Sequence, residues 1–148
     1  VEIVPTLRTD PEVLKAAQDF TTKVKKTGVT IRDFTGFVVN RLLTPFMVDA
    51  MRTVQEGLAS IAAIDSAMQL GANHPMGPLA LADFIGLDIV FHMSNNLYDE
   101  YREARFTPPP LLRRLVLAGY LGRKSGKGFY NYSTTPPTPN DFLVSSVA

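Results

Sequence analysis

One side chain stands out because its polar amide falls within an apolar pattern. On a helical wheel, Asn40 lies between Met47 and Met51, inside the apolar arc of a helix predicted over residues 37–58. A buried amide without a hydrogen-bond partner costs about 1–3 kcal/mol, so we expect Asn40 to have a partner. Two kinds of partner stay open here: a local cap or neighbouring loop, which position alone favours, and a bound ligand.

The histidines and aspartates form no recognisable catalytic or metal site. His74 and His92 are the only histidines, and neither has a Ser, a Cys or a second His at the spacing of a triad or zinc site. We therefore predict packing or surface roles for both. The aspartates are too scattered for a two-carboxylate mechanism. Asp65 is expected on the outer face of its helix, and Asp83 and Asp88 bracket a helix break, where capping is the ordinary role.

A local basic patch follows in the last third of the chain. From Arg102 to Lys127 there are seven basic residues and one acidic residue, Glu103, which gives 7 − 1 = +6. Such a patch suits phosphate groups, and it equally suits a solvated face with cations at helix ends. Gly126 and Gly128 flank Lys127, but no strand-to-helix turn follows, so this is not a P-loop.

Composition excludes several classes of protein. The chain has 148 residues, enough for one domain with a core, and its 45% hydrophobic and 20% charged residues are typical of a globular protein. Fifteen basic and fourteen acidic residues leave a net charge of +1, so we expect neither nucleic acid nor an anionic membrane as partner. No apolar run approaches the ~20 residues of a membrane span. The absence of cysteine fits a reducing compartment.

Apolar residues recur at steps of three and four along most of the chain, which is typical of helices around one core. We predict an all-α fold, a bundle of about five or six helices with a short N-terminal β fragment at residues 1–4. That strand lacks obvious partners, although residues 29–31 read as a short extended piece. The predicted helices cover residues 10–27, 37–58, 61–70, 78–84, 87–101 and 111–118.

Six short segments occur together in the order found in one known family. They are Gly36–Leu43, Glu56–Gly57, Ile64–Asp65, Gly71–Pro78, Asp83–Asp88 and Lys124–Tyr132. With G-F-V-V-N-R, H-P-M-G-P and K-x-G-x-G-F-Y in register, the chain resembles the C-terminal domain of the 3-hydroxyacyl-CoA dehydrogenases, which include the 3-hydroxybutyryl-CoA dehydrogenases. The resemblance covers roughly residues 1–132.

The resemblance implies a domain organisation. In that family an N-terminal Rossmann domain binds NAD, and the helical domain closes over the cleft and forms the dimer interface. Residues 1–8 would then end the Rossmann domain, residues 9–132 would be the helical domain, and residues 133–148 a poorly ordered Pro/Ser-rich tail. Because residue 1 is Val and the dinucleotide-binding motif is missing, we expect a processed or truncated product that is inactive by itself.

The resemblance also implies a reaction and site residues. The family oxidises the 3-hydroxyl of an (S)-3-hydroxyacyl-CoA to a ketone in fatty-acid and butanoate metabolism, and hydride passes to NAD. Its catalytic His, Glu and Ser lie in the Rossmann domain, so no catalytic residue is expected here. Asn40 matches a family Asn that contacts the substrate near the reacting carbon, and Lys124 matches a lysine that reaches the cofactor. Tyr130 matches the closing G-F-Y segment, which implies a substrate contact.

Partners and alternatives complete the predictions. The implied partners are acyl-CoA and a second copy of the chain, and the implied location is the cytoplasm, or the mitochondrial matrix or peroxisome in a eukaryote. Two alternatives stay open: a non-catalytic helical dimerisation module, and a related sugar-acid (gulonate-type) dehydrogenase. Dimerisation is also suggested by large apolar residues that exceed the apparent need of one small core, namely Met47, Met51, Phe84, Phe91 and Met93.

Overall fold

The structure is a computed structural model that describes residues 1–141. It contains two compact units, Val1–Leu42 and the residues from Leu43 onward, which we describe separately. The described residues contain six α-helices and short strands, so the predicted all-α bundle with a β fragment is confirmed. The helices are α1 (Pro11–Lys23), α2 (Val39–Gln55), α3 (Ile61–Gly71), α4 (Pro78–Ile85), α5 (Leu87–Tyr101) and α6 (Pro110–Leu117).

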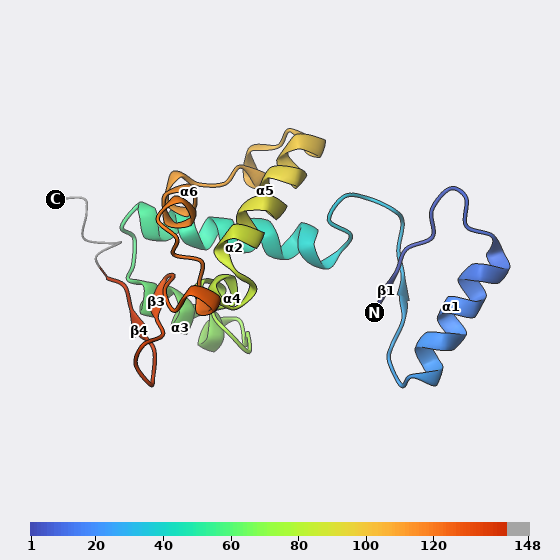
Figure 1. The fold of residues 1–148 in the computed structure, drawn as a ribbon, viewed down its shortest axis with the longest axis horizontal. Helices are drawn as coiled ribbons and strands as arrows, with labels where there is room; N and C mark the ends of the chain where they lie inside the picture. Colours follow the sequence, from blue (N-terminus) through green and yellow to red (C-terminus); the bar gives the residue numbers. More distant parts are fainter. Residues whose placement is uncertain (142–148) are drawn as a thin grey trace. The chain divides into compact units, whose positions relative to one another are not determined.

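The first unit is a β-α-β arrangement (Figure 1). Strand β1 (Glu2–Ile3) pairs in parallel with β2 (Val29–Thr30), and helix α1 connects them. The expectation that the N-terminal strand lacks a partner is therefore wrong. Parallel strands cannot be joined by a tight turn because they need a crossover connection, and here α1 provides it. Residues 29–31, predicted as a short extended piece, are the partner.

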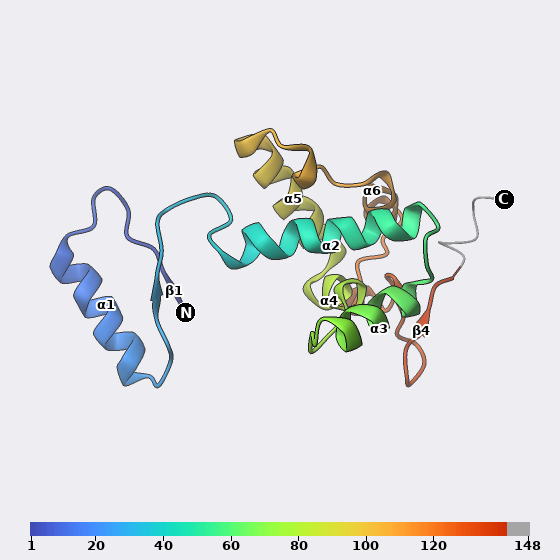
Figure 2. The same cartoon turned by 180° about the vertical axis from the view of Figure 1, so that it is seen from behind.

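The second unit is built around α2. Figures 1 and 2 show α5 on one side of this helix and α3 on the other. Met47 and Met51 are fully buried in the core, so these two methionines are not surplus apolar surface as the sequence suggested. The rest of the core comes from every helix after α2 and from the C-terminal segment: Ile61, Ile64, Leu79, Ala82, Leu87, Val90, Leu111, Leu112, Leu115 and Phe129.

Short elements close the second unit. Single 3₁₀ turns lie at Ala104–Phe106 and Arg123–Ser125. Strands β3 (Tyr130–Asn131) and β4 (Thr138–Pro139) pair antiparallel. The described part of the tail predicted over 133–148 therefore contains a paired strand, whereas residues 142–148 lie outside the described residues. None of the described helices is both long and apolar enough to cross a membrane.

Candidate functional site

Two buried carboxylates lie at the centre of the second unit. Asp65 of α3 is 4% exposed and Asp83 of α4 is 1% exposed. The prediction that Asp65 lies on the outer face of its helix is wrong, because α4 begins against that face. Buried carboxylates need hydrogen bonds or charge partners to offset their lost hydration. The arrangement of the surrounding backbone supplies these hydrogen bonds.

Asp65 caps a helix to which it does not belong. Its Oδ1 accepts the N–H of Leu79 at 2.8 Å and its Oδ2 accepts the N–H of Ala80 at 3.0 Å, both in the first turn of α4. The N-cap residue of α4 is Gly77, which has no side chain to satisfy these amides. A Cβ at Gly77 would overlap Asp65, so glycine is the residue that lets the carboxylate reach the helix start.

Asp83 holds the segment that follows the basic Gly-rich turn. Its Oδ1 accepts the N–H of Phe129 at 3.0 Å. Its Oδ2 accepts the N–H of Tyr130 at 2.9 Å and the hydroxyl of Tyr132 at 3.0 Å. The sequence suggested that Asp83 caps the helix break after α4. Its carboxylate instead accepts these three hydrogen bonds. Its carboxylate connects α4 to residues 46 positions further along the chain.

Two glycines make this close approach possible. A Cβ on Gly122 would overlap the backbone of Asp83, and a Cβ on Gly128 would overlap its carboxylate. Gly122 also has a positive φ of 88°, which favours glycine. The Gly-rich turn around Lys127, which its sequence context excluded as a P-loop, is thus the part of the chain that packs against Asp83.

Tyr130 connects the two carboxylates. Its backbone N–H donates to Asp83, and its hydroxyl donates to Asp65 Oδ2 at 2.8 Å. Burial, followed by the hydrogen bond to Asp65, raises the pKa of the Tyr130 hydroxyl, which stays protonated and donates. Burial and the charge of Asp83 likewise raise the pKa of Tyr132. A substrate contact of Tyr130 stays a prediction, and its hydroxyl already has one protein partner.

Burial also raises the pKa of the Asp83 carboxyl. Loss of hydration raises the pKa of its carboxyl from an ordinary 3.8 to about 6, and the negative charge of Asp65 adds to this effect. The N–H groups of Tyr130 and Phe129 and the hydroxyl of Tyr132 oppose the rise, because they stabilise the ionised form. The charge of Asp83 therefore changes closer to neutral pH than that of an ordinary aspartate.

Lys124 extends from the 3₁₀ turn toward the start of α5. Its Nζ donates to Asp88 Oδ1 at 2.5 Å, and this hydrogen bond lowers the pKa of the Asp88 carboxyl. Lys124 is 44% exposed, so the ammonium has donors left for a second partner. The predicted cofactor contact is neither shown nor contradicted by this pairing and stays a prediction.

Asn40 lies in the first turn of α2 and is exposed, so its predicted burial is wrong. Its neighbours Val38 and Val39 are about half exposed, and Leu42 is 65% exposed. The apolar arc of α2 is thus covered from Met47 onward, and its first turn is open. The side chain of Asn40 makes no hydrogen bond within residues 1–141. The local cap that position alone favoured is therefore not seen among those residues.

The histidines lie against aromatic rings. The rings of His74 and Phe46 are 5.1 Å apart, and those of His92 and Phe91 are 6.0 Å apart. These contacts agree with the predicted packing and surface roles. In the part of the chain that the structure describes, no group of three or more His, Cys, Asp or Glu side chains is arranged to hold a metal ion.

The basic patch is divided among several surroundings. Arg102, Arg105 and Lys124 form ion pairs with acidic side chains. Arg123 lies over the rings of Phe84 and Tyr132, at 5.3 and 5.5 Å from their centroids. The patch is therefore not one continuous phosphate-binding face within these elements, and its binding role stays a prediction.

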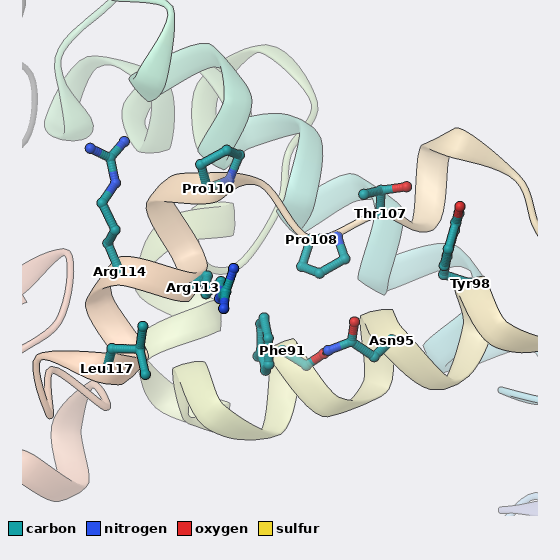
Figure 3. Close-up of a pocket in the computed structure, with 9 residues that line it drawn as sticks. All are labelled: Phe91, Asn95, Tyr98, Thr107, Pro108, Pro110, Arg113, Arg114 and Leu117. Atoms are coloured by element: carbon teal, nitrogen blue, oxygen red, sulfur yellow. The ribbon is translucent and has the colours of Figure 1, made fainter.

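A groove of about 680 Å³ lies between α5 and α6 (Figure 3). In the figure, the Arg113 guanidinium lies near the Phe91 ring, whereas the Arg114 side chain extends away from it. Neither arginine forms an ion pair with a described carboxylate. The groove is mainly apolar, and it is lined by Phe91, Asn95, Tyr98, Thr107, Pro108, Pro110, Arg113, Arg114 and Leu117.

Solved structures define the class to which this fold belongs. (S)-3-hydroxybutyryl-CoA dehydrogenase from Ralstonia eutropha is 44% identical, with a TM-score of 0.87, over 90% of this chain and 47% of that chain. 3-hydroxybutyryl-CoA dehydrogenase from Escherichia coli K12 is 37% identical, with a TM-score of 0.86, over 90% of this chain and 29% of that chain. The fold is thus that of a helical domain found in 3-hydroxybutyryl-CoA dehydrogenases.

Sequence comparison assigns the family. A probable 3-hydroxybutyryl-CoA dehydrogenase of Bacillus subtilis is 48% identical over 132 residues, which are 89% of this chain and 46% of that protein. The 3-hydroxybutyryl-CoA dehydrogenase of Bradyrhizobium diazoefficiens is 43% identical over 94% of this chain and 47% of that protein. The family model described as 3-hydroxyacyl-CoA dehydrogenase, C-terminal domain, matches residues 36–132. The chain belongs to this family, as the motifs predicted, and spans about half the length of the curated relatives it matches.

The residues that sequence reasoning missed carry a recognisable signal. Asp65 is the only charged residue of α3, and Asp83 is the only charged residue of α4. A single carboxylate in an otherwise uncharged helix has no neighbouring charge on the same helix to pair with. An internal partner is then the expected explanation.

The close approach of Gly128 to Asp83 gives a first testable prediction. Gly128→Ala should lower the free energy of unfolding by about 1–3 kcal/mol, because the new Cβ displaces the carboxylate from its donors. Gly71→Ala is the matched control, since nothing lies within 4 Å of its added Cβ, and it should stay within about 0.5 kcal/mol of the wild type. Urea denaturation measures both, and equal stabilities for the two variants would contradict the packing described.

The raised pKa of Asp83 predicts a pH effect. Between its ordinary value of 3.8 and its folded pKa of about 6, the folded chain keeps the Asp83 proton and the unfolded chain loses it. Raising the pH through this window therefore lowers the contribution of Asp83 to stability, by about 3 kcal/mol at most.

Thermal unfolding measured at pH values from about 4 to about 7, a range that spans this window, detects the effect. Asp83→Asn should flatten the fall in stability relative to the wild type, whatever its stability at one pH. The same substitution at the exposed Asp19 is the control and should keep the wild-type pH dependence. A wild-type slope in Asp83→Asn would contradict the assignment.

Proposed function

We propose that this chain forms the substrate-closing and dimer-forming part of an NAD-dependent 3-hydroxyacyl-CoA dehydrogenase. The observation that carries the proposal is the match of residues 36–132 to the family's C-terminal domain, with Asn40 exposed on an uncovered helix turn inside that match. The names of the relatives favour 3-hydroxybutyryl-CoA as the substrate. NAD and acyl-CoA esters are intracellular metabolites, so we place the reaction in the cytoplasm.

The first unit supports a connection to a dinucleotide-binding sheet. Two parallel strands of two residues do not make a stable sheet by themselves, and parallel sheets are normally covered on both faces. Phe20 and Val29 are more than half exposed, which is apolar surface available to such a sheet. The β-α-β connection favours an end of the dinucleotide-binding domain near residue 35, later than the residue 8 expected from sequence.

A pocket in this unit has the position expected of a ligand site in such a sheet. It has a volume of about 570 Å³ and lies beyond the carboxyl ends of β1 and β2. In parallel α/β sheets, ligands bind at the carboxyl ends of strands. The residues from Pro5 to Leu7 and from Thr30 to Phe34 line it, and they supply backbone groups and the Thr6 hydroxyl for polar contacts.

In the proposed reaction, the C3 hydrogen of the substrate leaves as hydride to the nicotinamide, and the hydroxyl proton passes to a base outside this chain. Asn40 would donate an amide N–H to the substrate oxygen as its charge changes, or orient the thioester carbonyl. The uncovered apolar turn around Asn40, including Leu42, would lie over the bound ligand and exclude water.

Lys124 fits the predicted cofactor contact. One donor of its ammonium is used by Asp88, and the others are available to a phosphate or ribose oxygen. The Asp88 carboxylate fixes the direction of the ammonium without burying it. NAD supplies the hydride acceptor when it is bound, and this chain's part is to hold and orient it.

Substitution of Asn40 tests the proposed function. In the enzyme assembled with its dinucleotide-binding domain, Asn40→Ala should lower kcat/KM for 3-hydroxybutyryl-CoA by about 100-fold, because one positioned donor is lost. Asn96→Ala, on an exposed face of α5, is the control and should keep wild-type kinetics. Dimer assembly should not change in either variant.

Three results would contradict the proposed function. Unchanged kcat/KM in Asn40→Ala would remove its assigned role, and this is also the result expected of a non-catalytic dimerisation module. Activity on a sugar acid with none on the CoA ester would favour the related sugar-acid dehydrogenases. Absence of both activities in the assembled wild-type enzyme would refute a dehydrogenase role altogether.

We also propose that the α5–α6 groove is the contact between two copies of the chain. Leu117 is 76% exposed at its edge, and Arg113 has no described acidic partner. Asp99 and Glu100 lie at the opposite end of α5, so an antiparallel pairing across a two-fold axis brings acidic and basic ends together.

A charge placed in this groove tests the interface. Leu117→Asp should convert the dimer to monomers in sedimentation or light-scattering measurements, because a carboxylate is desolvated against an apolar surface. Leu70→Asp, at a leucine of α3 that is 87% exposed and lies outside the groove, should leave the dimer intact. A monomeric wild type, or a dimeric Leu117→Asp variant, would contradict this interface.

A further inference from the structure

The segment Gly122–Tyr132, which we call the 122–132 loop, has little regular structure of its own. It contains one 3₁₀ turn, two isolated bridges and the two-residue strand β3. Both bridges use Lys127, which pairs with Gly122 and with Asn131. This loop carries Lys124, which the proposed function assigns to the cofactor, and Tyr130, for which the family resemblance implies a substrate contact. Its position must therefore be fixed by something outside the loop.

Asp83 of α4 makes several direct hydrogen bonds to the loop. Its carboxylate accepts three hydrogen bonds from the loop, two from the consecutive backbone amides of Phe129 and Tyr130 and one from the Tyr132 hydroxyl. Two adjacent amides held by the two oxygens of one carboxylate fix the direction of the backbone as well as its distance. A shift of one residue along the loop would leave these buried donors unpaired.

The same aspartate is closely packed on both sides. Gly122 lies against its backbone and Gly128 against its carboxylate, with no space for a Cβ at either position. The loop is thus held at its beginning and near its end by one residue of α4. Lys124 lies between these two glycines, two residues after Gly122.

The ammonium of Lys124 is tied to the same part of the fold. Its partner Asp88 lies in the first turn of α5, directly after the break at Gly86 that separates α5 from α4. The N–H of Leu87 also donates to the carbonyl of Leu121, the residue directly before the loop, at 3.2 Å. The end of α4 and the start of α5 therefore hold the loop backbone and the lysine side chain together.

We propose that Asp83 is a positioning residue for the reaction: by clamping the 122–132 loop onto α4, it sets where Lys124 and Tyr130 meet the ligands, although it touches no ligand itself. This inference rests on the proposed function for its ligands, and on the hydrogen bonds and glycine contacts for the clamp. Its consequence is that binding of the nucleotide-bearing ligand depends on a carboxylate that is buried away from solvent.

The chemistry of the clamp requires a carboxylate of this length. An asparagine presents one acceptor and one donor group, so its NH₂ would face a backbone N–H of the loop. A glutamate is one methylene longer and would enter the space next to Gly128 that already excludes a Cβ. Asp83→Asn therefore removes the clamp with the smallest change in volume.

The first experiment measures the clamp in this chain. Hydrogen exchange read by mass spectrometry should show amides of the 122–132 loop exchanging about 10- to 100-fold faster in Asp83→Asn, and amides of α2 unchanged. Tyr132→Phe removes one of the three donors and should give a smaller increase in exchange in the same loop. This variant replaces Asp83→Asn in the experiment if Asp83→Asn does not fold. Asp19→Asn is the matched control on an exposed carboxylate of α1. Uniform acceleration across the chain, or no change in the loop, would overturn the clamp.

The second experiment measures positioning in the enzyme assembled with its dinucleotide-binding domain. Asp83→Asn, or Tyr132→Phe in its place, should raise KM for NAD by about 10-fold with kcat within about 2-fold, because only binding geometry is lost. If Asp83 acts through Lys124, Asp83→Asn combined with Lys124→Ala should have the same KM as Lys124→Ala alone.

The outcomes separate this inference from the proposed function. An active wild type whose Asp83→Asn variant keeps its KM for NAD would overturn the positioning role, and so would additive effects of the two substitutions. An assembled wild type with no dehydrogenase activity would refute the proposed function, while the hydrogen-exchange result would still decide whether the clamp exists.

Discussion

Hydrogen bonds between two buried carboxylates and backbone amides hold the second unit of this protein together. Asp65 and Asp83 accept six hydrogen bonds in total, four of them from backbone N–H groups. Each carboxylate loses its hydration on folding, and only a complete set of donors offsets that cost. The start of α4 and the course of the 122–132 loop therefore have to be arranged around these two side chains, and Tyr130 bonds to both of them.

This constraint gives a physical meaning to motifs of the family that lie outside the ligand contacts. Gly77, Gly122 and Gly128 are positions where a side chain would displace a buried carboxylate or its backbone. The H-P-M-G-P and K-x-G-x-G-F-Y segments thus act first on the fold. Through the position of Lys124 they act on the proposed ligand contacts, whereas Asn40 lies in the other compact unit, on an open helix turn.

Periodicity and turn chemistry predicted most of the fold. The helices over 61–70, 78–84 and 87–101 occur within one residue of their expected bounds. Ser60 caps α3 by accepting the N–H of Ala63. These features are local, since a helix needs only a repeating apolar face and a suitable end. The partner of β1 was missed because parallel pairing joins residues that are 27 positions apart. The prediction that Asn40 is buried was wrong, because periodicity shows which residues share a helix face and cannot show whether that face is covered.

The sequence by itself determined the helical class, the bounds of α3, α4 and α5 and, through motifs in register, the family, whereas α1 and α2 are shorter than predicted. Those properties depend on the order and types of residues within short stretches. Only the tertiary structure decided which aspartates are buried, which glycines face them, that Lys124 pairs with Asp88 and that Asn40 is open to solvent. Each of these depends on segments far apart in the chain meeting in space. A carboxylate such as Asp83 is surface or core according to what packs against it.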